Sequence, residues 1–83
     1  MLNCNLNIKV LFNEVIQEMG GSTQKQDMFA LMFLEIAVIH WEIYCRFKRE
    51  DIVRAVAVLS KGKQGTYLSP QLQTICKALL SLR

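Results

Sequence analysis

The chain has 83 residues, of which 52% are apolar, and a formal net charge of +3. This length allows one helical domain, residues 1–83, and the apolar content excludes a disordered chain. Three cysteines without a Cys-x-x-Cys pair and one histidine argue against a zinc site or a disulfide framework. We therefore expect no cofactor, no metal and a reducing, cytoplasmic location, and no secretory signal is visible.

The first predicted element is a helix from about Asn5 to Met19. Its apolar residues recur with the spacing of a single helical face. Two glycines follow it, and glycine readily adopts the left-handed conformation that ends many helices. Residues 22–26 are predicted to form a loop.

The second predicted element, Met28–Cys45, constrains the protein most, because only Glu35, His40 and Glu42 among its eighteen residues are polar. We expect it to be a helix with Asp27 as its N-cap. A helix that is apolar nearly all round must be covered on most sides, and a small chain has little material for this. Another chain is therefore expected to supply part of the cover. The two glutamates disfavour a stable membrane span.

An aromatic stripe runs along this predicted helix. At about 100° per residue, one side collects aromatic and apolar residues, while Glu35, Glu42, Arg46 and Arg49 gather on the opposite side. Large aromatic residues dominate the energetics of many interfaces. The predicted partner-binding residues are Phe29, Phe33, Ile36, His40, Trp41 and Tyr44.

Two further elements complete the predicted fold. Ile52–Leu59 is expected to be a helix capped by Glu50 or Asp51, although its valines leave a buried strand as an alternative. Ser69-Pro70 opens the last helix, since serine caps and proline fits the first helical position. That helix has apolar residues at helical spacing from Leu72 to Leu80. The sequence thus predicts an all-α fold, a small bundle of three to four helices arranged as hairpins.

Catalytic chemistry is not expected. His40, the only histidine, lies within the aromatic stripe, and Cys45 falls about 140° away around the same helix. Glu35 and Glu42 are interpreted as part of a solvated polar face of the helix rather than as an acid–base pair. The loop that follows Leu59 lacks the GxxxxGK[ST] phosphate-binding pattern. We therefore predict that the protein is not an enzyme.

Charge is distributed unevenly, and this leaves nucleic-acid binding open as the alternative function. Residues 46–83 hold eight of the ten basic residues and only two of the seven acidic ones. A small dimeric DNA-binding regulator would use such a patch to contact phosphates. The gap between Leu59 and Pro70 is, however, too long for a helix-turn-helix. The predicted basic patch comprises Arg46, Lys48, Arg49, Arg54, Lys61 and Lys63.

The segment Ile39–Lys61, IHWEIYCRFKREDIVRAVAVLSK, resembles one helical hairpin of a tetratricopeptide-type array, with Ala55 as the small residue early in the second helix. Ser69-Pro70 resembles the proline before the next helix of such arrays. Small type III secretion chaperones and co-chaperones are similar in size and in having such hairpins. The resemblance implies a cytoplasmic protein that shields an amphipathic helix of a secreted subunit. We therefore expect a non-enzymatic, chaperone- or adaptor-like module that binds a hetero-partner or a second copy.

Overall fold

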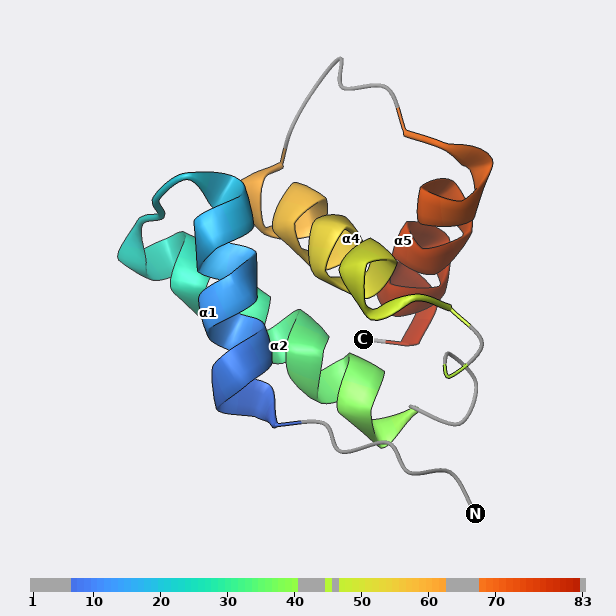
Figure 1. Ribbon diagram of the computed structural model, residues 1–83, viewed down its shortest axis with the longest axis horizontal. Helices are drawn as coiled ribbons and strands as arrows, with labels where there is room; N and C mark the ends of the chain where they lie inside the picture. The colour runs from blue at the N-terminus through green and yellow to red at the C-terminus, as the bar shows by residue number, and fades with distance from the viewer. Residues whose placement is uncertain (1–6, 41–44, 46, 63–67, 83) are drawn as a thin grey trace.

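The computed structural model describes residues 7–40, 45, 47–62 and 68–82, and these residues form four α-helices and no strand (Figure 1). The predicted all-α class is therefore confirmed. The radius of gyration of 11.8 Å is that of a compact domain of this length, about 12 Å. The helices are α1 (Ile8–Met19), α2 (Gln24–Ile39), α4 (Arg49–Lys61) and α5 (Pro70–Leu82).

Helix α1 is capped by a polar residue, Asn7, at its start and by a glycine, Gly20, at its end. The side chain of Asn7 accepts a hydrogen bond of 3.0 Å from the backbone N–H of Lys9, so the helix begins later than the predicted Asn5. Gly20 has φ of 71° and donates its N–H to the carbonyl of Gln17. A residue with a side chain is disfavoured at this φ, which explains why glycine ends the helix.

Helix α2 differs from the prediction at both ends. Thr23, not Asp27, is the N-cap: its hydroxyl accepts from the N–H of Gln26 at 3.2 Å, and the Gln26 side chain accepts from the N–H of Thr23 at 2.9 Å. This capping box satisfies two backbone donors together, and Asp27 lies within the first turn. The helix ends at Ile39 with His40 as its C-cap, so the predicted unbroken extension to Cys45 is interrupted at His40. Within that extension, residues 41–44 lie outside the described part of the chain.

Helix α4 lies at the centre of the bundle and packs against α1, α2 and α5 (Figure 1). The helix prediction for Ile52–Leu59 is confirmed, and the strand alternative is wrong. Lys48 occupies the N-cap position without a side-chain hydrogen bond, so the predicted caps Glu50 and Asp51 instead lie in the first turn. Carboxylates are favourable there because they face the partially positive end of the helix.

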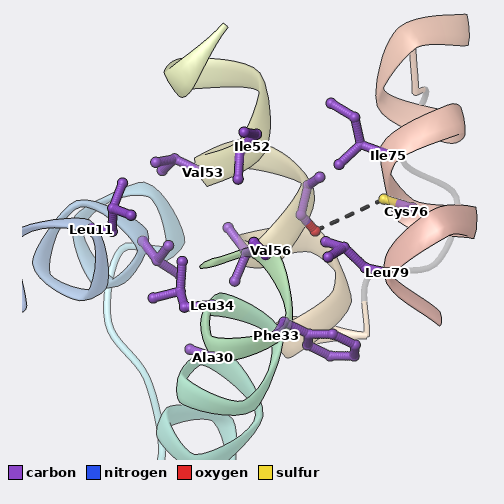
Figure 2. Close-up of a cluster of buried hydrophobic side chains, with 14 of the residues drawn as sticks. Leu11, Ala30, Phe33, Leu34, Ile52, Val53, Val56, Ile75, Cys76 and Leu79 are labelled. Carbon is purple, nitrogen blue, oxygen red and sulfur yellow. Dashed lines mark hydrogen bonds between the residues drawn. The ribbon is translucent and has the colours of Figure 1, made fainter. Parts of the chain in front are cut away.

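The core is formed by buried side chains from all four described helices, as Figure 2 shows. Leu11 of α1, Leu34 of α2, Val56 of α4 and Leu79 of α5 are each no more than 2% exposed. Four of the six side chains that α4 buries are alanines or valines, and small side chains at a contact let neighbouring helices approach closely.

The predicted last helix is confirmed, including its start. The hydroxyl of Ser69 accepts a hydrogen bond of 3.3 Å from the N–H of Leu72. Ile75 and Cys76 are buried, and the Cys76 thiol lies 3.9 Å from the carbonyl oxygen of Ala55 on α4 (Figure 2). Burial raises the pKa of this thiol above its ordinary value.

Candidate protein-binding surface

The predicted aromatic stripe lies on the flank of α2, between the core and solvent. Phe33 is only 3% exposed and belongs to the core, whereas Phe29 and Ile36 are half-buried and pack against it. His40 is half-buried at the C-cap, where its backbone N–H donates a hydrogen bond of 3.1 Å to the carbonyl oxygen of Ile36. Trp41 and Tyr44 lie outside the described residues. The structure thus assigns Phe33 to the fold and leaves Phe29 and Ile36 partly accessible.

A second apolar surface on α2 was missed by the sequence reasoning. Met28, Leu31 and Ile39 are 67%, 41% and 75% exposed. At about 100° per residue they fall on one side of the helix, and the exposed Glu35 lies between them. We call these three residues the α2 ridge. The sequence did contain a signal for this surface: apolar residues lie around Glu35 on the same side of the helix, so the side that holds Glu35 is not purely polar.

A groove of about 400 Å³ lies beside the stripe, where the N-terminal half of α2 meets the C-terminal end of α4 and the end of α5. The ring of Phe33 reaches this groove from the edge of the core, on the side of α5 (Figure 2). Its other apolar and basic lining residues are Phe29, Leu59, Leu80, Lys25 and Lys61. The groove combines an apolar floor with cationic side chains.

The described residues of the predicted basic patch do not form one surface. Lys48 and Lys61 lie at opposite ends of α4, about 20 Å apart along its axis. Arg49, which the sequence placed on the same helix as Glu35, belongs to α4. Its guanidinium donates to both carboxylate oxygens of Glu14 on α1, with Nε 3.3 Å from Oε1.

Arg54, the remaining described member of the basic patch, lies in a mixed-charge environment. It lines a shallow hollow of about 300 Å³ together with Glu14, Glu18 and Glu50. Carboxylates beside an arginine reduce the positive potential that a phosphate backbone would need. Arg46 and Lys63, the last two predicted members, are not among the described residues.

The described part of the chain holds no group of three histidine, cysteine, aspartate or glutamate residues arranged to bind a metal ion. None of its helices combines the length and the hydropathy that crossing a bilayer requires. The chain matches no protein-family model, and no curated protein or solved structure matches it.

Proposed function

We propose that the protein is a non-enzymatic binding module that covers an apolar helix of another chain with the outer side of α2. The observation that carries this proposal is the α2 ridge, with Ile39 and Met28 more than half exposed. Exposed apolar side chains gathered on one side of a helix, here around the exposed Glu35, are typical of protein-binding sites. The half-buried Phe29 and Ile36 flank the ridge and would extend the contact.

The mode of binding follows from the shape of this surface. In this mode an amphipathic helix buries its apolar face in a groove between helices. The side chains that anchor it recur at helical spacing. The α2 ridge would contact one side of such a helix, and the groove beside Phe29 would accept a side chain from it. Phe33 is 3% exposed and belongs mainly to the core, although it also lines the groove.

A chaperone- or adaptor-like role in the cytoplasm, such as that of a type III secretion chaperone, is the more specific form of the proposal. It is supported by the sequence resemblance of Ile39–Lys61 to a repeat hairpin, whose second helix would be α4 and whose first half includes residues outside the described part of the chain. The shielding of an aggregation-prone helix would use the same apolar surface. The partner in this form of the proposal is a different chain, and a second copy is the alternative.

The experiment uses cells that naturally produce the protein. It compares the size of the assembly that contains the tagged chain between the wild type and two variants. Replacing Met28 and Ile39 by glutamate should release the chain from its assembly, because carboxylates cannot be buried against an apolar helix without large cost. Val10→Glu is the control, since Val10 is 43% exposed and belongs to a different helix, α1. An unchanged assembly for the ridge variant would contradict the proposal.

A further inference from the structure

Resting on the proposed function, we propose that the partner helix is acidic: its carboxylates pair with Lys25 and Lys61 while its apolar side chains enter the groove between them. The two lysines come from different helices, α2 and α4, and both line the same groove. Among the described residues that line it there is no aspartate or glutamate. The groove therefore has one sign of charge along an apolar floor.

Both lysine side chains are available for such a contact. Lys25 and Lys61 are exposed, and neither forms an ion pair with a described residue. Arg49, in contrast, is already paired with Glu14. Positive charge without an internal partner favours a partner of the opposite charge, both by steering its approach and by excluding basic competitors.

The floor of the groove determines the rest of the partner's chemistry. Phe29 and Leu59 are half-buried and Leu80 is 43% exposed, so apolar surface remains uncovered between the two lysines. A volume of about 400 Å³ lies within the range of about 300–1,000 Å³ of pockets that hold organic ligands. An apolar floor between two cations fits a helix whose apolar stripe is bordered by aspartate or glutamate.

The test measures binding of two synthetic helical peptides to the purified full chain by fluorescence anisotropy. Both peptides carry the same leucine stripe, bordered by glutamate in one and by lysine in the other. The glutamate peptide should bind at least about tenfold more tightly, and added salt should reduce this preference. Combining Lys25→Glu with Lys61→Gln should abolish it.

A matched control variant combines Lys9→Glu with Lys77→Gln. Lys9 occupies the second position of α1, as Lys25 does of α2, and both control lysines are exposed outside the groove. Glutamate is well tolerated in the first turn of a helix, so both double variants should fold. The control should keep the preference for the glutamate peptide.

Three results would overturn the inference: equal binding of the two peptides, binding of neither, or loss of the preference in the control. Lysine-dependent binding to phosphatidylserine vesicles, without peptide binding, would also overturn it and assign the groove to a membrane surface. If the glutamate substitutions at Met28 and Ile39 release the chain from its assembly but the two peptides bind equally, the inference fails and the proposed function stands.

Discussion

Helix α2 is the most apolar of the described helices, yet it lies at the side of the bundle and exposes Met28 and Ile39. Helix α4 carries five charged residues in thirteen positions, yet it is the central helix and packs extensively against each of the other three, whereas α2 has only a slight contact with α5. The charges of α4 lie at its two ends and at Arg54, so its middle is free to be buried. The comparison teaches that the distribution of polar residues, rather than the apolar content, decides which helix becomes the centre.

The largest expected difference in unfolding free energy between the two helices appears when a carboxylate is placed on each of them. Val56→Asp puts a charge at a position of α4 that is 0% exposed, and it should cost more than about 4 kcal/mol and unfold the domain. Ile39→Asp on α2 should change the free energy of unfolding by less than about 0.5 kcal/mol. Urea unfolding followed by circular dichroism measures both. Equal destabilisation would break the distinction between the two helices.

The next effect sharpens the division of α2 into a core side and an outer flank. Phe33→Ala should lower the free energy of unfolding by about 3–5 kcal/mol, because Phe33 is buried in the core. Phe29→Ala removes a half-buried ring and should cost clearly less. Thermal unfolding of the two variants provides the comparison. A larger loss for Phe29 would show that the outer flank, not the core side, stabilises the fold.

The helix starts provide a smaller contrast, since α2 has a capping box and α4 has no side-chain cap. Thr23→Ala should destabilise the protein by about 1 kcal/mol through the loss of the acceptor for Gln26. Lys48→Asp should stabilise it by about 0.5–1 kcal/mol, because aspartate can cap α4. Unfolding midpoints in urea test both signs. Opposite signs in either variant would contradict these cap assignments.

The smallest expected effect concerns the contact of α4 with α5. Burial raises the pKa of the Cys76 thiol in the folded state above its ordinary value of 9.0. The folded protein then holds its proton more tightly than the unfolded chain, so this contribution to stability is present below pH 9.0 and is lost as the pH rises beyond it. Cys76→Val should flatten the decline of unfolding free energy above that pH. An unchanged decline would assign it to other groups.

Several elements could be predicted because their signals are local. Gly20 and the pair Ser69-Pro70 mark helix ends through backbone conformation alone, and the apolar spacing of α1 identifies its buried side. The start of α2 could not be decided in this way. Thr23 and Asp27 can both accept backbone hydrogen bonds, and only the reciprocal contact with Gln26 favours the threonine.

The candidate site was less predictable than the fold, because α2 is apolar on all sides. Phe33 and Ile39 are equally apolar in the sequence, but one is 3% exposed and the other 75%. Which side faces the core depends on where α4 packs, and that is a property of the whole bundle. The end of α2 at Ile39 is likewise marked by neither glycine nor proline.

Oxidation of the methionines by hydrogen peroxide tests the central claim most directly, because Met28 is 67% exposed and Met19 only 3%. Sulfoxide formation follows exposure, and Met19 serves as the internal reference for a folded chain. In the dilute purified chain, Met28 should be oxidised much faster than Met19. In the assembly isolated from cells, Met28 should be oxidised several-fold more slowly, with Met19 unchanged. Oxidation of Met28 at the same rate in both preparations would contradict the claim that another chain covers α2.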